Sequence, residues 1–143
     1  MTPSRSNSLR TQLWPLSVAA TVFVASSHSR VAAPPVVNVD KYAHFLVYGL
    51  LATLLLRALA GRRGAAWAEL LLASFYGATD EFHQSFVPGR SCDVADWLAD
   101  TTGAALAIGL YVYWGAYRSL LEFPLMRKRR VEKRAAAAKV VAP

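Results

Sequence analysis

Acidic residues are scarce in this chain, and their positions are informative. Asp and Glu together number nine among 143 residues, against 16 Lys and Arg. Five of the nine acids fall in one stretch, residues 80–100, which reads DEFHQSFVPGRSCDVADWLAD. Long apolar runs rich in small residues lie on both sides of it. A dense polar cluster between two membrane-length segments is costly to keep without a use.

Other absences narrow the classes of fold and function. The single cysteine, Cys92, excludes an internal disulfide, and we expect it to be a small packing residue. The sequence contains no specific metal-binding spacing, no nucleophile elbow and no phosphate-binding loop. It also lacks a strand pattern and an internal repeat, so we expect neither a β-rich fold nor a repeat fold.

The chain is rich in hydrophobic residues. They make up 55% of the sequence, whereas charged residues make up only 17%. The apolar residues come in long blocks rather than in the short periodic pattern of a soluble fold. The composition therefore predicts an all-α protein of one domain, a polytopic membrane helical bundle with about four transmembrane helices.

The net charge of +7 is placed where a membrane surface explains it better than nucleic acid does. Eight of the 16 basic residues lie at or after Arg118, next to a hydrophobic segment. Anionic lipid headgroups attract basic clusters that follow a membrane span. We therefore expect membrane lipids as partners and no nucleic acid.

The first apolar run allows two interpretations. Residues 1–12 are polar and basic, and we expect them to form a loose cytoplasmic segment. Residues 13–27 are apolar, with Pro15 near the start, where a helix tolerates proline. The run is short for a span, so it is either a retained transmembrane helix or a signal peptide whose basic start is Arg5 and Arg10. We favour the retained helix.

Three further helices are expected. Residues 41–60 are long enough, at 1.5 Å per residue, to cross roughly 30 Å of hydrocarbon. A tight basic turn at residues 61–64 leads into a third helix at residues 65–84. A loop containing Pro88 follows, and a fourth helix is expected from about residue 93 to residue 121.

The basic residues predict the orientation. Thirteen of the 16 Lys and Arg fall in residues 1–12, residues 57–64 and the segment from Arg118 onward, which face one side of a four-helix bundle. The positive-inside rule then places both termini in the cytoplasm of a multi-pass protein of the bacterial cytoplasmic (inner) membrane. We assign residues 13–123 to the transmembrane domain and residues 124–143 to a basic cytoplasmic tail, which lies on anionic lipid or only sets the orientation.

Polar residues recur at helical spacing near the outer ends of the helices. His44 follows Asp40 by four positions and shares its face, with Lys41 beside it. An acidic stripe at i, i+3 and i+7 runs through Asp93, Asp96 and Asp100. The alternative for acids near a helix start is that they only cap the helix and suit its dipole.

These polar residues are expected to converge. Because the turn at residues 61–64 is short, the second and third helices are antiparallel neighbours, and the loop after the third helix keeps the fourth beside it. We predict one hydrogen-bonded candidate catalytic site, with Asp40 and Lys41 in support, made of His44, Asp80, Glu81, Gln84, Arg90, Asp96 and Asp100. Arg90 should pair with at least one of the acids, because a buried unpaired charge costs several kcal/mol. For His83 we expect no role in the site.

Small residues predict close helix packing. Ala95, Ala99, Gly103 and Ala107 recur every four positions on the fourth helix. Such rows let membrane helices approach closely. This row would carry the neighbouring acids into the bundle and away from lipid.

Three blocks resemble a known family. DKYAHFLVYGLL, DEFHQSFVPGRS and DVADWLADTTGA, in that order, resemble the signature blocks of the VanZ-like family over about residues 38–110. These are small bacterial integral membrane proteins, and the founding type is linked to resistance to the glycopeptide teicoplanin. The resemblance implies that the family's recurrent polar positions fall here on Asp40, Lys41, His44, Asp80, Glu81, Gln84, Arg90, Asp96 and Asp100. Many relatives carry Asn at the position of Asp100. The resemblance implies fold and location, and no reaction.

Two classes of function remain open. In the first, the protein acts on or binds a cell-envelope or lipid-linked anion at the extracytoplasmic face. Arg90 and Lys41 would hold its phosphate or carboxylate, and His44, Asp80 or Glu81 would transfer protons. In the second, it is a non-catalytic accessory subunit that binds other membrane protein subunits.

Paired carboxylates would suit Mg²⁺ or Ca²⁺, but no spacing specifies a metal or cofactor.

The charge distribution predicts which residues can be reached from outside the cell. In a Cys92→Ser background, single cysteines at residues 35 and 90 should react with an impermeant maleimide in intact cells. Cysteines at residues 62 and 135 should react only after permeabilisation, because the basic segments stay in the cytoplasm. Labelling of residue 62 but not of residue 90 in intact cells would contradict the predicted orientation.

Overall fold

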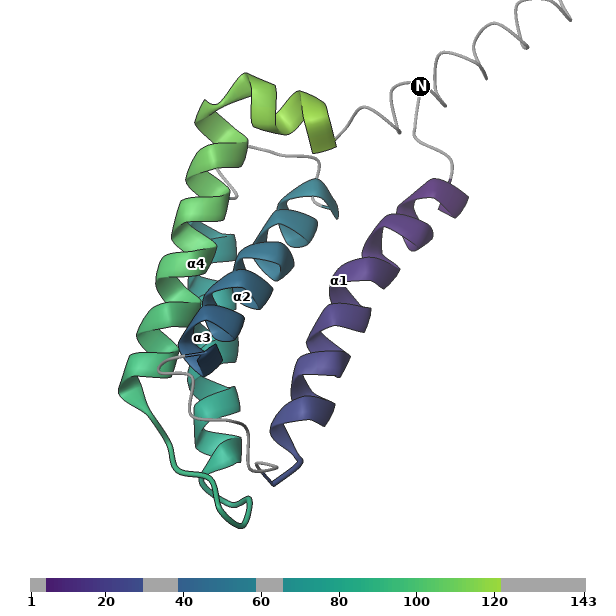
Figure 1. The fold of residues 1–143 in the computed structure, drawn as a ribbon. Coiled ribbons are helices and arrows are strands. Elements are labelled where there is room, and N and C mark those ends of the chain that lie inside the picture. The colour runs from purple at the N-terminus through teal and green to yellow at the C-terminus, as the bar shows by residue number, and fades with distance from the viewer. Residues whose placement is uncertain (1–4, 30–38, 59–65, 122–143) are drawn as a thin grey trace, which may run out of the picture. The chain divides into compact units, whose positions relative to one another are not determined.

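The computed structural model describes residues 5–29, 39–58 and 66–121, and these residues form helices and no strand. The helices are α1 (Arg5–Ser26), α2 (Val39–Ala58), α3 (Ala66–Gln84) and α4 (Val94–Tyr113), followed by a helical segment at 115–121 (Figure 1). The chain divides into two compact units, Met1–Gly109 and Leu110–Pro143. The predicted all-α class is confirmed for the described residues.

The helix ends differ from the expected ones at two places. α1 begins at Arg5 rather than Leu13, so the expectation of a loose segment is wrong for residues 5–12. That stretch contains neither glycine nor proline, so nothing in it interrupts the helix. α4 ends at Tyr113, one non-helical residue before the segment at 115–121, rather than running unbroken to residue 121.

Several sequence expectations fall outside the described residues. These concern the basic turn at residues 61–64 and the tail at residues 124–143.

One described helix, α2, is long and apolar enough to cross a membrane by length and composition. α1 contains a shorter apolar stretch, Leu13–Ser26. α3 and α4 carry acidic residues inside otherwise apolar sequence, which lowers their hydropathy. The expected four spans therefore stay a prediction, while the membrane character of α2 is supported.

α3 has its polar residues inside and its large apolar residues outside. The buried face of this helix consists of Glu69, Ala73, Gly77, Asp80, Glu81 and Gln84. Its exposed large side chains include Trp67, Leu71, Leu72, Phe75 and Phe82. A soluble helix shows the opposite arrangement, with its apolar stripe facing the core.

α1 packs against both α2 and α3. Val22 lies in an apolar cluster with Tyr48 and Leu51 of α2. The Tyr76 hydroxyl on α3 donates a hydrogen bond to the Ala19 backbone oxygen at 2.7 Å. α1 is therefore held to the bundle by apolar packing and by a polar contact.

α2 and α4 approach each other closely at glycine. A Cβ atom on Gly103 would collide with the Phe45 backbone oxygen, and one on Gly49 would lie 3.2 Å from the Gly103 backbone oxygen. The predicted row of small residues on the fourth helix thus marks a true helix–helix contact. This contact fixes the positions along α2 and α4 that face each other.

Gly103 should therefore tolerate substitution poorly. Gly103→Ala places a methyl group against the α2 backbone, which cannot move aside as a side chain can, and should cost about 1–3 kcal/mol. Gly109→Ala is the matched control on the same helix, because open space surrounds Gly109. Thermal unfolding of the purified protein in detergent would measure both. Equal stability of the two variants would contradict the close contact.

Candidate functional site

The predicted polar residues meet where α2 and α4 begin and where α1 and α3 end. α2 supplies Lys41 and His44, α3 supplies its last turn, and α4 supplies its first two turns. The members that hydrogen bonds or short distances bring together are Lys41, His44, Asp80, Glu81, Gln84, Arg90, Asp93, Asp96 and Asp100. We call this set the polar cluster.

Lys41 joins α2 to the acidic stripe of α4. Its Nζ donates to Asp93 Oδ2 at 2.8 Å and to Asp96 Oδ1 at 2.9 Å. The Asp96 side chain is 2% exposed, whereas those of Lys41 and Asp93 are 32% and 42% exposed. Lys41 therefore supplies a counter-charge to a carboxylate that water scarcely reaches.

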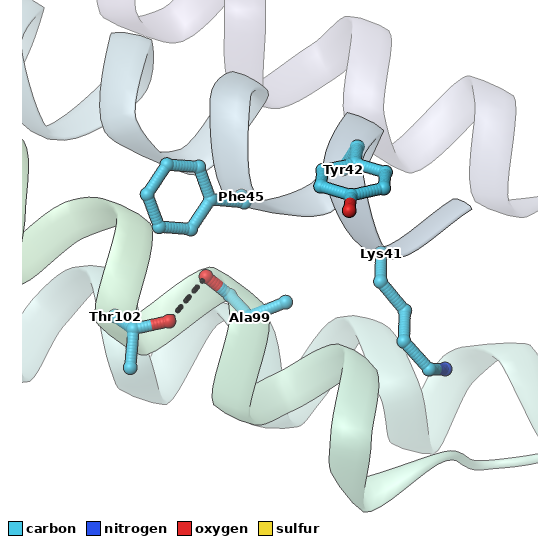
Figure 2. Close-up of a pocket in the computed structure, with 5 residues that line it drawn as sticks. All are labelled: Lys41, Tyr42, Phe45, Ala99 and Thr102. Atoms are coloured by element: carbon cyan, nitrogen blue, oxygen red, sulfur yellow. Dashed lines mark hydrogen bonds between the residues drawn. The ribbon is translucent and has the colours of Figure 1, made fainter. Parts of the chain in front are cut away.

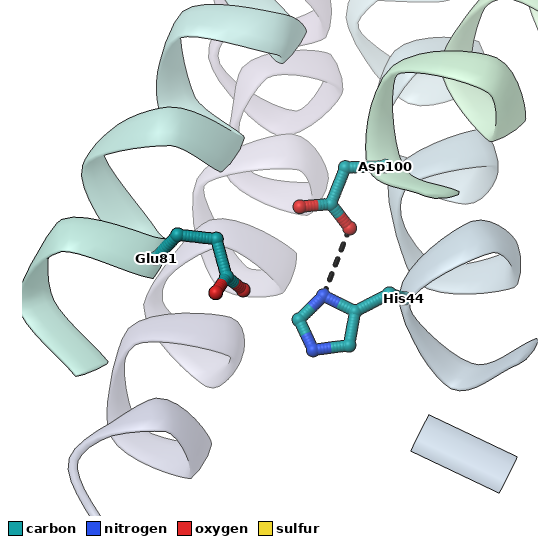
Figure 3. Close-up of side chains that lie close together, drawn as sticks. All are labelled: His44, Glu81 and Asp100. Carbon is teal, nitrogen blue, oxygen red and sulfur yellow. Dashed lines mark hydrogen bonds and ion pairs between the residues drawn. The ribbon is translucent and has the colours of Figure 1, made fainter. Parts of the chain in front are cut away.

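His44 forms the second link between these two helices. Its Nδ1 lies 2.9 Å from Asp100 Oδ1, and Asp100 is fully buried. Figure 3 shows the Glu81 carboxylate of α3 turned toward this pair. Ligand atoms of His44, Glu81 and Asp100 all lie within 4.8 Å of one another. Three helices therefore bring one imidazole and two carboxylates to a single point.

Gln84 lies between Arg90 and the acids of α3 and hydrogen-bonds to both. Arg90 Nη1 donates to Gln84 Oε1 at 2.7 Å. Gln84 Nε2 in turn donates to Asp80 Oδ2 and to Glu81 Oε1, both at 3.2 Å. Within the part of the chain that the structure describes, no ion pair joins Arg90 to an acid. The expected Arg90–acid pair is wrong there, because the amide stands between the two.

The sequence did not predict a site role for two residues that hydrogen-bond to these acids. Ser26 on α1 donates through its hydroxyl to Asp80 Oδ2 at 2.9 Å. The Asp93 backbone N–H donates to Glu81 Oε2 at 2.8 Å, so the loop before α4 also holds a site carboxylate. The acidic stripe placed Asp93 beside the predicted site residues. Ser26 could be recognised only from the way α1 packs against α3.

Buried negative charge dominates the cluster. The carboxylates of Asp80, Glu81, Asp96 and Asp100 are all 3% exposed or less. Asp80 Oδ1 and Asp100 Oδ2 have no hydrogen-bond partner among the described residues. The nearby Tyr48 hydroxyl, one turn after His44, is also buried and unpartnered. Buried polar atoms are normally hydrogen-bonded, so orphan atoms of this kind need an explanation.

Glycine and helix dipoles make room for this charge. A Cβ atom on Gly77 would lie 2.8 Å from Asp100 Oδ2, so a larger residue at this position of α3 would force the carboxylate to move. The N-termini of α2 and α4 both lie at this end of the bundle. Their partial positive charge favours acidic side chains in the first turn.

Other titratable residues lie apart from the cluster's centre. Asp40 Oδ1 accepts the Lys41 backbone N–H at 3.1 Å. His83 Nε2 lies 3.1 Å from the Ser27 hydroxyl, and the His83 ring contacts Phe23. Cys92 is exposed. Glu69 is buried in the first turn of α3, at the end opposite to Glu81.

An open groove of about 280 Å³ lies between α2 and α4, and Lys41 stands in its wall. Figure 2 shows the other lining residues, which are Tyr42, Phe45, Ala99 and Thr102. The Thr102 hydroxyl donates to the Ala99 backbone oxygen at 3.1 Å, so it is already satisfied within its helix. The groove therefore offers a mainly apolar surface with one cation, Lys41, that also belongs to the polar cluster.

A comparison with protein-family models shows which family the chain resembles. The family model described as VanZ/LLP1 matches residues 1–115, which include every residue of the polar cluster. No curated protein and no solved structure matches the chain significantly.

Lys41 and Asp96 should be energetically coupled. Lys41→Met leaves the Asp96 carboxylate buried without its cation and should cost about 1–3 kcal/mol of unfolding free energy. Asp96→Asn in the same chain removes the stranded charge and should restore part of that loss. A double-mutant cycle on unfolding in detergent measures the coupling. Strict additivity of the two single substitutions would show that the ion pair contributes nothing.

Proposed function

This chain belongs to the VanZ/LLP1 family, as the resemblance predicted, and we propose that it is an integral membrane protein whose polar cluster binds a lipid-linked anionic ligand of the cell envelope. The observation that carries the proposal is the groove between α2 and α4, where an apolar wall leads to Lys41, a cation of the polar cluster. A ligand-binding role explains a cluster that packing alone does not require.

The inverted pattern of α3 supports the membrane part of the proposal. Acids face the bundle while aromatic and leucine side chains face outward. Lipid stabilises such an outer surface, whereas water would not. Ionisable residues inside a membrane bundle commonly mark a substrate or ion site. The contacts of α1 with α2 and α3 support its retention as part of the same bundle.

The groove between α2 and α4 supports an amphiphilic ligand. A hydrocarbon chain would lie against Tyr42, Phe45 and Ala99, all of which line the groove. Its polar head would then reach Lys41, which connects the groove to Asp93 and Asp96. A membrane lipid enters such a lateral opening directly from the bilayer.

His44 is best placed for proton transfer if the site is catalytic. Its Nδ1 pairs with the buried Asp100, which orients the ring and stabilises its protonated form. Figure 3 shows the second ring nitrogen on the side of the ring away from Asp100. Glu81 stands beside it as a second candidate.

The charge distribution supports an extracytoplasmic site. The polar cluster lies at the starts of α2 and α4, whereas in sequence the Lys and Arg residues concentrate near the N-terminus, after α2 and after α4. The positive-inside rule places those segments in the cytoplasm. The cluster would then face the cell envelope, consistent with the glycopeptide-resistance link that the family resemblance implies.

The proposal predicts a Glu81-dependent bound amphiphile. Native mass spectrometry of the full chain, purified in mild detergent, should detect a co-purifying phosphate- or carboxylate-bearing lipid. Glu81→Gln and His44→Gln should each reduce its occupancy by about tenfold or more. Glu81 orients Gln84 and the Asp93 backbone, and His44 orients Asp100, so each change disturbs the groups that shape the site. Glu69→Gln is the matched control, since it neutralises a buried acid at the other end of α3.

The same preparation tests the accessory-subunit alternative. If a second membrane protein co-purifies in stoichiometric amount, and if the Glu81→Gln variant loses that partner instead of a lipid, the cluster serves assembly and the proposal is wrong. Equal lipid occupancy in the wild type and in both cluster variants would also overturn it.

A further inference from the structure

The geometry points to a divalent metal site made by His44, Glu81 and Asp100, and we propose that it takes a first-row transition-metal ion of the Zn²⁺ or Mn²⁺ kind. This inference rests on the proposed function, because it names the group through which the same site would hold an anionic ligand. It draws on three observations, which are the spacing of the ligand atoms, the unpartnered Asp100 oxygen and the balance of buried charge.

The three side chains come from three different helices and already converge. Their nitrogen and oxygen atoms lie within 4.8 Å of one another. Bonds of about 2.0–2.2 Å to one ion place neighbouring ligand atoms about 3.0–3.6 Å apart in octahedral or tetrahedral geometry. Only small side-chain movements would therefore close the set around a single ion. Figure 3 shows Glu81 and Asp100 facing each other across the space beside the imidazole.

Asp100 supplies the second observation. It is fully buried, and its Oδ2 has no hydrogen-bond partner among the described residues. Figure 3 shows this oxygen turned toward the Glu81 side, away from His44. An unpartnered carboxylate oxygen at this depth costs stability unless a proton or a cation satisfies it. A metal ion bound beside Glu81 would do so.

The balance of charge favours a cation over direct binding of an anion. The cluster contains four buried carboxylates and two permanent cations, Lys41 and Arg90. Lys41 is already shared by Asp93 and Asp96, and Arg90 reaches Asp80 and Glu81 only through Gln84. An anionic ligand brought into this cluster alone would add to its negative charge. A divalent ion reverses that sign locally and provides a ligand-binding position.

The donor set indicates the kind of metal. One imidazole and two carboxylates give three protein ligands, the number usual in catalytic zinc sites, which leave further positions open, although this set is richer in carboxylate than most of them. Mn²⁺ also accepts carboxylate-rich sites, whereas Mg²⁺ and Ca²⁺ prefer oxygen ligands alone. The supporting hydrogen bonds are present as well, because Glu81 accepts from the Asp93 backbone N–H and from Gln84.

Isothermal titration calorimetry on the full chain tests the site. The tag-free protein in detergent, stripped of metal by a chelator, is titrated separately with Mn²⁺, Zn²⁺, Mg²⁺ and Ca²⁺. We expect one Mn²⁺ or Zn²⁺ per chain, bound more tightly than Mg²⁺ or Ca²⁺. His44→Gln and Glu81→Gln should each weaken binding by more than about tenfold, while Glu69→Gln should leave it unchanged. Size-exclusion profiles and tryptophan fluorescence confirm that each variant is folded.

Several results would overturn the inference. These are the absence of saturable Mn²⁺ or Zn²⁺ binding to the folded wild type up to about 1 mM, and binding that survives both cluster substitutions. If a variant does not fold, the wild-type titration alone decides whether the metal site exists.

The metal site and the proposed function can be contradicted independently of each other. If no metal binds but an amphiphile still co-purifies in a Glu81-dependent way, the metal site is wrong and the proposed function stands. If Mn²⁺ or Zn²⁺ binds at His44 and Glu81 but no amphiphile co-purifies, the metal site stands and the proposed lipid-linked ligand is wrong.

Discussion

Buried negative charge is the constraint on which the rest of this structure depends. Asp80, Glu81, Asp96 and Asp100 are all withdrawn from water at one end of the helices. A buried carboxylate is tolerated only when cations, hydrogen-bond donors or dipoles compensate it. Each neighbouring element supplies such a group: α2 gives Lys41 and His44, the loop after α3 gives Arg90 through Gln84, and α1 gives Ser26.

That compensation works only if the helices hold one register. The contact of Gly103 with the α2 backbone sets α4 against α2, so that Lys41 faces Asp96 and His44 faces Asp100. Gly77 lets α3 pack closely against Asp100. Small residues therefore do more than pack helices, because they fix the distances between charged groups. A site held this way is pre-organised, which suits recognition of a charged ligand.

The sequence predicted most of what depends on local pattern. The lengths of the apolar blocks predicted α2, α3 and the start of α4, and helical spacing placed Asp96 and Asp100 on one face. The short turn between the second and third helices predicted the convergence of His44 with Glu81. The relay through Gln84, the hydroxyl of Ser26 and the start of α1 at Arg5 were not predicted. Those features depend on side-chain rotamers and on contacts between distant segments, which spacing does not encode.

The stability of Glu81→Gln tests most directly whether the cluster is a site or a scaffold. A functional site commonly holds charges that lower the stability of the protein without its ligand. If the cluster is a ligand site, neutralising Glu81 should leave the thermal unfolding temperature of the ligand-free protein in detergent unchanged or higher. If the temperature falls as steeply as it does when a core residue is truncated, Glu81 holds the fold together and the cluster is a structural network.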